Sequence, residues 1–269
     1  MTLIKSFVRK IARRAIVNSI GSVSKVAPGV HILAGHYTSR NLNVNDECFE
    51  RLLSGLSKKA RFIRIEDACE IIDRKECVDE PLIAFTFDDG FQDCFVSIAP
   101  ALERYKTNAA FFINPGFAKS DDMAAHLFSK EVLGVPGKKP MRESAIRSLA
   151  ESGFVIGAHT IDHADLRSQD NNFLTQQIVG CKSLVEEISG TPCNWFAWTY
   201  GGYKHISEAA LSMALETYDR VFSSDSHESY TGPDSRILNR RHFEPFWSLS
   251  EVKFFTRKKR FFPSQVPCA

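Results

Sequence analysis

Short apolar runs alternate with longer amphipathic stretches along most of this 269-residue chain. The apolar runs predict strands at residues 30–34, 61–65, 82–87, 109–113, 154–158, 195–198 and 220–223. The amphipathic stretches predict helices, for example over residues 46–57, 94–105, 143–152, 174–189 and 206–217. Strand–helix alternation is typical of a parallel sheet covered by helices, because parallel strands need long crossover connections. About seven such units therefore predict an α/β barrel or a doubly wound sheet.

The middle of the chain shows no interdomain linker, so we expect one barrel domain over residues 30–247. A basic amphipathic extension over residues 1–29 precedes it, and a basic-aromatic tail over residues 248–269 follows. Gly134, Pro136, Gly137 and Pro140 predict a surface loop insertion within residues 116–140. Hydrophobic residues make up 43% and charged residues 25%, which excludes a disordered or collagen-like chain. The net charge of +2 gives no reason to expect a nucleic-acid partner.

Both ends of the chain combine positive charge with apolar residues. Residues 3–16 repeat apolar side chains at helical spacing, with basic side chains on the other face. Such a helix lies on an anionic membrane surface or packs on the protein's own core or a partner subunit. A second cluster near the C-terminus predicts another interfacial contact or a solvated tail: Phe254, Phe255, Arg257, Lys258, Lys259, Arg260, Phe261 and Phe262.

The cellular location follows from the N-terminal charges and the cysteines. Basic residues interrupt the first 20 residues, so no secretory signal is expected there. The seven cysteines include no CxxC pair, and an odd number argues against a disulfide framework. We therefore expect a cytoplasmic protein, with peripheral contact at the inner face of the membrane as an open alternative.

The strongest chemical signal is the segment Phe85-Thr86-Phe87-Asp88-Asp89-Gly90, in which an apolar strand runs directly into two carboxylates and a glycine. Successive residues that leave a strand point in different directions. One carboxylate can then bind a metal ion while the other faces the water on that ion. A plain strand-to-loop turn is the alternative, because Asp-Gly is common in turns.

A second signal follows the apolar run of residues 154–158: His159-Thr160-Ile161-Asp162-His163. Two imidazoles four residues apart suit one divalent cation if the segment makes a helical turn. In parallel α/β barrels, the loops at the carboxyl ends of the strands meet at one face. Two histidines and one aspartate would leave room for water, as in a catalytic zinc site.

A third segment, Phe196-Ala197-Trp198-Thr199-Tyr200-Gly201-Gly202, ends an aromatic strand in a double glycine. The glycines allow close backbone approach, and a backbone N–H there can donate to an oxyanion.

Together these segments resemble the polysaccharide deacetylase family, carbohydrate esterase family 4, with its NodB homology domain. Residues 86–90 match the TFDDG motif, residues 159–163 match H[ST]xxH, and residues 196–201 are similar to the third motif, FAYPYG. Residues 32–38 resemble the LxYHxV segment that precedes the domain in many members. The resemblance covers roughly residues 30–244. It implies a distorted (β/α)7 TIM-like barrel and metal-dependent hydrolysis of N-acetyl groups on amino sugars.

The resemblance also implies a role for individual residues. Asp88 would be the general base, and the backbone N–H of Tyr200 would help to hold the oxyanion. His36 would be the general acid, with His242 as the alternative. The metal ligands would be Asp89, His159 and His163, and the ion would be divalent, with zinc as the first choice.

Two departures from the family pattern affect the pocket. Many members carry an arginine in the third motif that orients the base, and here Ala197 stands in its place. Arg240 is a candidate substitute. Trp198 and Thr199 replace the usual tyrosine and proline. We expect Trp198, Arg240 and His242 to contact the substrate.

The function predicted from the sequence is removal of an N-acetyl or N-formyl group from an amino sugar. The sugar would belong to a bacterial surface polysaccharide or to its lipid- or nucleotide-linked precursor. One alternative is a non-catalytic glycan-binding relative that retains the barrel and the metal site. Another is a partner-binding protein that acts through its cationic ends.

Overall fold

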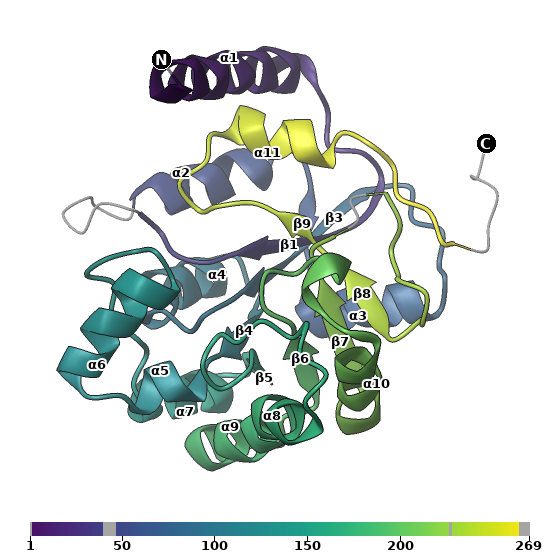
Figure 1. The fold of residues 1–269 in the computed structure, drawn as a ribbon. Coiled ribbons are helices and arrows are strands. Elements are labelled where there is room, and N and C mark those ends of the chain that lie inside the picture. The colour runs from purple at the N-terminus through teal and green to yellow at the C-terminus, as the bar shows by residue number, and fades with distance from the viewer. Residues whose placement is uncertain (1, 40–46, 226–227, 264–269) are drawn as a thin grey trace.

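The computed structural model describes residues 2–39, 47–225 and 228–263, with side chains from residue 13 onward. Its centre is a parallel sheet with the strand order β8-β7-β6-β5-β4-β3-β1-β9, curled into a barrel (Figure 1). The strands are β1 (Gly29–Gly35), β3 (Pro81–Phe87), β4 (Ala109–Ile113), β5 (Val155–Ala158), β6 (Trp195–Ala197), β7 (Arg220–Ser223), β8 (Ile237–Asn239) and β9 (Arg241–His242). A short strand, β2 (Arg61–Phe62), pairs with β3 outside this order.

One broken strand closes the barrel. β8 pairs with β7 at one end of the sheet, and β9 pairs with β1 at the other end. Only Arg240 separates β8 from β9, and its N–H donates to the Ser223 carbonyl at 2.9 Å. Counting β8 and β9 as one strand gives seven strand positions in the described barrel. This confirms the predicted (β/α)7 TIM-like barrel.

Alternation along the strands divides the core in two. In β3, Leu82 and Ala84 join the cluster inside the barrel, while Ile83 and Phe85 pack under the surrounding helices. This alternation is the two-residue repeat of a strand. Both faces are buried, which explains why the strand segments read as continuous apolar runs.

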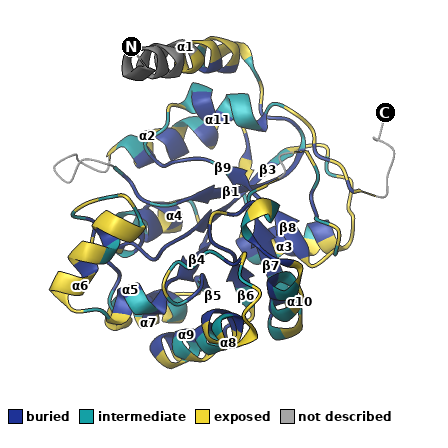
Figure 2. Cartoon of the chain, in the orientation of Figure 1, coloured by how far each residue is buried: buried dark blue, intermediate teal, exposed yellow. Residues whose placement is uncertain are grey.

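Helices cover the outside of the barrel (Figure 2). In chain order they are α2 (Glu47–Leu56), α3 (Ile65–Asp73), η1 with α4 (Cys94–Ile98, Ala99–Arg104), α5 (Pro115–Lys119), α6 with η2 (Asp122–Leu127, Phe128–Val132), α7 (Glu143–Glu151), α8 with η3 and α9 (Asn171–Thr175, Gln176–Gly180, Cys181–Ser189), η4 (Tyr203–His205) and α10 (Glu208–Thr217). The six described cysteines form no disulfide, and Cys268 lies outside the described residues.

Two local predictions were wrong. The strand expected over residues 61–65 is only two residues long, because helix α3 begins at Ile65. The surface loop expected over residues 116–140 contains most of α5, all of α6 and all of η2. The carboxylate of Asp121 caps α6 by accepting the Ala124 N–H at 2.8 Å, a signal that the glycines and prolines obscured.

The N-terminal helix α1 (Thr2–Val23) packs against α11 (Leu249–Thr256), outside the barrel (Figure 1). A Cβ on Gly21 would lie 1.9 Å from the Ser250 carbonyl oxygen, so the glycine permits this close approach. The Arg14 guanidinium also pairs with Glu251 at 2.9 Å. No helix in the described part of the chain is long and apolar enough to cross a membrane.

The C-terminal cluster is only partly a surface feature. Phe261 is exposed, whereas Phe262 and Arg260 are buried. The Arg260 guanidinium donates to the carbonyl oxygens of Ser229 and Asn239. The alternative of a fully solvated tail was therefore wrong for residues 254–262. Residues 254–256 belong to α11, and Arg260 and Phe262 are buried.

Candidate active site

Two adjacent carboxylates emerge where β3 ends. The Asp88 N–H still donates to the Gly35 carbonyl at 2.9 Å, so Asp88 continues the strand ladder. Asp89 has a φ of 71°, a left-handed conformation that non-glycine residues rarely adopt. Gly90 continues the turn with a φ of 72°. This sharp turn separates the directions of the two carboxylates, as the sequence predicted.

The two motif histidines lie at the end of β5, two strands away from β3. Thr160 and His163 have φ values of 60° and 53°, so this loop is also held in left-handed conformations. Strained backbone of this kind persists where the surrounding structure fixes it, and it clusters at functional sites.

Buried polar groups hold the histidine loop. The Asn114 amide, at the end of the intervening strand β4, donates to the carbonyl oxygens of His159 and Thr160. The Gln177 Oε1 accepts hydrogen bonds from the backbone N–H groups of Ile161 and Asp162, at 3.0 and 3.2 Å. A Cβ on Gly116 would lie 2.7 Å from the Ile161 carbonyl oxygen, so no other residue fits there unchanged.

Asp89, His159 and His163 converge as the sequence predicted. The Asp89 Oδ1 lies 3.4 Å from His159 Nε2 and 3.5 Å from His163 Nε2. All three ligand atoms lie within 4.8 Å of one another. Such a set of two imidazoles and one carboxylate is typical of sites for zinc and similar divalent ions.

The donor atoms of this triad fit a cation. His159 Nδ1 donates to the Ala197 carbonyl at 2.6 Å, which directs Nε2 at Asp89 Oδ1. Burial lowers the pKa of His163 to about 4, so its imidazole is neutral at pH 7. Asp89 Oδ1 is buried and accepts no hydrogen bond within the described residues. A buried carboxylate oxygen without a partner is rare, and a cation would satisfy it.

Asp88 forms a buried ion pair with Arg240. The guanidinium donates to both carboxylate oxygens, at 2.7 and 2.8 Å, and Arg240 has no exposed surface. Although burial raises the pKa of Asp88, the charge of Arg240 holds it well below its usual value. Arg240 thus makes the contact with Asp88 that was expected of a substitute for the arginine that the third motif lacks. Its complete burial argues against the predicted contact with substrate.

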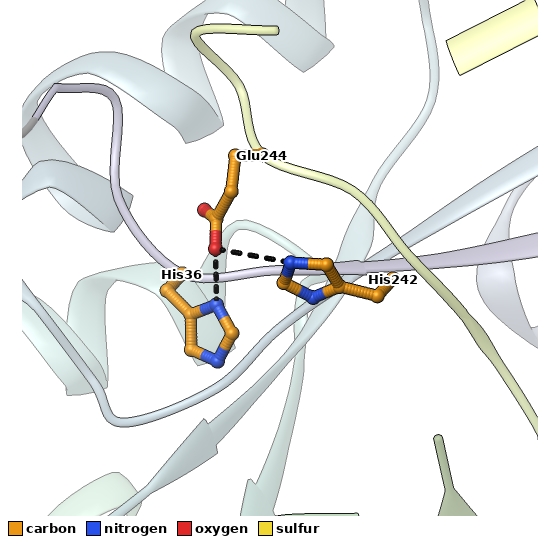
Figure 3. A group of neighbouring side chains, drawn as sticks. All are labelled: His36, His242 and Glu244. Carbon is orange, nitrogen blue, oxygen red and sulfur yellow. Dashed lines mark hydrogen bonds and ion pairs between the residues drawn. The ribbon is translucent and has the colours of Figure 1, made fainter. Parts of the chain in front are cut away.

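His36, at the end of β1, pairs with a glutamate that the sequence analysis missed. His36 Nδ1 lies 2.9 Å from Glu244 Oε1 (Figure 3). Although burial lowers the pKa of His36, the charge of Glu244 and their hydrogen bond raise it to about 10. His242 Nε2 lies 3.6 Å from the same oxygen. His242, the alternative general acid, therefore lies beside His36, and both imidazoles face the same carboxylate oxygen.

The third motif forms a tight turn beside the triad. Tyr200 has a φ of 62°, and its exposed ring lies edge-on to the His163 ring at 4.9 Å. Trp198 is fully buried, and its indole N–H donates to the Gly202 carbonyl at 3.1 Å. Its ring lies 5.4 Å from the ring of Tyr203, and contact between Trp198 and substrate stays a prediction.

These groups line one cleft of about 390 Å³. It contains Asp88, the triad of Asp89, His159 and His163, Tyr200 and the cluster of His36, His242 and Glu244. Apolar side chains of Val132, Leu133 and Val135, from the segment after α6, form another wall. A cleft of this size, with convergent polar groups on an apolar wall, is typical of a small-molecule site.

The fold and the cleft together define an α/β-barrel protein with a candidate hydrolytic centre. The family model described as Polysaccharide deacetylase matches residues 75–217, more than half of the chain. The chain belongs to the polysaccharide deacetylase family, which confirms the resemblance noted in the sequence.

Individual relatives agree with this assignment. YxkH of Bacillus subtilis (strain 168), named as a polysaccharide deacetylase, is 25% identical over 138 residues, or 51% of this chain. The match spans 42% of that protein, less than half of its length. Among solved structures, IcaB from Ammonifex degensii superposes with a TM-score of 0.68 at 18% identity, covering 88% of this chain and all of IcaB. The deacetylase PplD of Streptococcus pyogenes superposes with a TM-score of 0.64 at 18% identity, covering 87% of this chain and all of PplD. At such identities the structures show a shared fold.

Proposed function

We propose that this protein is a metal-dependent deacetylase that removes an N-acetyl or N-formyl group from an amino sugar. The substrate would be a bacterial surface polysaccharide or its lipid- or nucleotide-linked precursor. The observation that carries the proposal is one cleft that holds the Asp89 triad, the paired Asp88 and the paired His36. Family membership and the solved complex of PplD with acetate support the same chemistry.

In this proposal Asp89, His159 and His163 hold a divalent cation, with zinc as the first choice. When bound, the cation supplies Lewis-acid polarisation of the amide carbonyl and acidifies water. The triad's own contribution is orientation. The Ala197 carbonyl fixes the tautomer of His159, and the left-handed turn at Asp89 aims its carboxylate at both imidazoles.

Asp88 acts as the general base. Arg240 keeps its carboxylate ionised and fixes both oxygens, so it can accept a proton from the attacking water. The backbone N–H of Tyr200, presented by the left-handed turn over Trp198, donates to the oxyanion that forms as the carbonyl is attacked.

His36 acts as the general acid. Its hydrogen bond to Glu244 holds Nδ1, and the second ring nitrogen points away from Glu244 (Figure 3). The raised pKa keeps the imidazole protonated at neutral pH, so it can protonate the leaving nitrogen. An unprotonated amine is a poor leaving group, which is why the acid is required.

Replacing Glu244 by glutamine tests this assignment through the pH profile. Glu244→Gln removes the charge that raises the pKa of His36, while burial, which lowers it, remains. An acid with a lower pKa loses its proton at lower pH. We therefore expect the alkaline limb of kcat/KM to shift to lower pH, with activity at acidic pH retained. An unshifted alkaline limb would argue against the pairing of His36 and Glu244 in catalysis.

The proposed activity is tested by acetate or formate release from N-acylated hexosamine oligomers and lipid-linked precursors. We expect release to disappear after chelation and to return with added zinc, because the triad has no other means of activating the carbonyl. Bound metal without release from any member of the panel would favour the non-catalytic glycan-binding relative instead.

We also propose that α1 makes peripheral contact with an anionic membrane surface. One face of α1 packs on α11, but Ile16, Ile20 and Val23 remain exposed at helical spacing. Arg13 is exposed on the same helix. An apolar stripe beside positive charge is typical of an interfacial helix. A location at the inner face of the cytoplasmic membrane stays a prediction from the sequence.

Changing Ile16, Ile20 and Val23 together to serine should weaken binding to phosphatidylglycerol vesicles several-fold, because apolar area is removed from the contact. Co-sedimentation measures the bound fraction, and turnover of a soluble substrate should be retained. A triple Val96→Ser/Met123→Ser/Leu127→Ser variant, which removes exposed apolar residues elsewhere, is the matched control. Equal vesicle binding by the two variants would contradict the contact.

A further inference from the structure

A second group of side chains in the cleft combines two imidazoles with a buried carboxylate: His36, His242 and Glu244. The parallel pairing of β1 with β9 brings the residues after these strands together, although 208 residues separate His36 from Glu244. Figure 3 shows the Glu244 carboxylate directed between the two rings. This group is distinct from the Asp89 triad and shares no residue with it.

Its geometry is that of a cation site. One nitrogen of each ring and one Glu244 oxygen lie within 4.8 Å of one another, at 2.9 and 3.6 Å from the carboxylate. Glu244 is 7% exposed, and its Oε2 is buried without a hydrogen-bond partner in the described residues. The oxygen that faces both rings is Oε1, and a carboxylate buried to this degree favours a positively charged partner.

We propose that His36, His242 and Glu244 form a second divalent-cation site, and that a zinc ion bound there inhibits the enzyme. The ligand set, two imidazoles and one carboxylate, suits zinc or another borderline divalent ion. The exposed side of His242, 45% of its side chain, gives the ion a route from solvent.

Inhibition follows from the atom that the ion would occupy, and this part rests on the proposed role of His36. An ion on His36 Nδ1 displaces the proton that Nδ1 shares with Glu244. The other ring nitrogen keeps its hydrogen, but a neutral metal-bound imidazole is a far weaker acid than an imidazolium. The leaving nitrogen then receives no proton, and the acyl transfer stops.

The second site should fill after the first. The side chains of the Asp89 triad are all at least nine-tenths buried, and the hydrogen bond of His159 Nδ1 to the Ala197 carbonyl already directs Nε2 at Asp89. In the second site His242 is half-exposed, and the His36–Glu244 hydrogen bond must open before an ion can enter. One zinc ion therefore supports activity, and an excess suppresses it.

Equilibrium dialysis of the metal-free full chain against zinc tests the site directly. We expect the wild type to bind two ions per chain, and His242→Gln and Asp89→Asn each to bind one. His126→Gln, which removes an exposed histidine from α6, is the matched control and should bind two. Crystals soaked in zinc should show anomalous scattering between His36, His242 and Glu244 in the wild type and not in His242→Gln. Circular dichroism establishes that each variant is folded.

Kinetics then test the inhibition. Zinc beyond the first equivalent should lower the wild-type rate, and His242→Gln should raise the inhibiting concentration about tenfold or more relative to its own uninhibited rate. One bound ion in the wild type, or equal stoichiometry in wild type and His242→Gln, overturns the site. Two bound ions with no loss of rate overturn the inhibition. If no substrate is turned over, the proposed function fails, while dialysis and diffraction still decide the second site.

Discussion

Asp88→Asn should lower kcat about 10²–10⁴-fold, the range typical for loss of a general base. The asparagine side chain is nearly isosteric but cannot take a proton from water. The proposed metal ligands are untouched, so zinc binding at the Asp89 triad should persist. Steady-state kinetics and zinc content, measured on the same preparation, separate loss of the base from loss of the metal.

The folding of this variant needs its own control. Arg240 loses its charge partner in Asp88→Asn, but it still donates to Thr86 Oγ1 and Ser224 Oγ. Assays therefore belong well below the melting temperature of the variant. Asp122→Asn, at a fully exposed carboxylate on α6, is the matched control and should retain activity. A kcat for Asp88→Asn within a few-fold of the wild type would remove Asp88 from the role of base.

Arg240→Met should destabilise the fold by about 3–5 kcal/mol, because it leaves the Asp88 carboxylate buried without its partner. The pKa of Asp88 should also rise, since burial remains and the main lowering charge is gone. If the pKa of Asp88 rises, its carboxylate becomes protonated at a higher pH, so activity is lost at a higher pH as the solution is acidified. We therefore expect a lower urea midpoint and an acidic limb of kcat/KM shifted to higher pH.

Two comparisons make this result specific. Arg236→Met removes an exposed arginine that is paired with Asp234, and such a surface pair contributes at most about 1 kcal/mol. Arg240→Lys keeps the positive charge but loses the bidentate contact with the Asp88 carboxylate. Its stability and pH profile should therefore lie between those of Arg240→Met and the wild type. If Arg240→Met were as stable as Arg236→Met, the buried pair of Arg240 and Asp88 would not contribute measurably to the stability of the fold.

The strands and the convergence of Asp89, His159 and His163 were predictable because short-range patterns encode them. Strands buried on both faces are continuous apolar runs, so β4 and β7 match the predicted bounds to the residue. Asp88 and His159 each follow such a run directly, and Asp89 comes next after Asp88. The rule that parallel strand ends share one face of a barrel was enough to bring them together.

Other parts of the site depend on contacts that no local pattern carries. Glu244 meets His36 only because β9 pairs with β1 in one register. The spacing of His242 and Glu244, alternate residues at the end of β9, was the available signal. The complete burial of Trp198 was not expected, although Phe196, two residues earlier, also packs under the helices. The strand repeat could have placed the indole away from the cleft.

The broken strand that closes the barrel also sets when the site can exist. During synthesis, a nascent chain that ends before Ile237 holds β1 and β3 to β7 but lacks Arg240, His242 and Glu244. Asp88, the proposed base, then lacks its guanidinium partner, and His36, the proposed acid, lacks its carboxylate partner. The complete cleft is therefore expected late in synthesis, when β8 and β9 join the two free edges of the sheet.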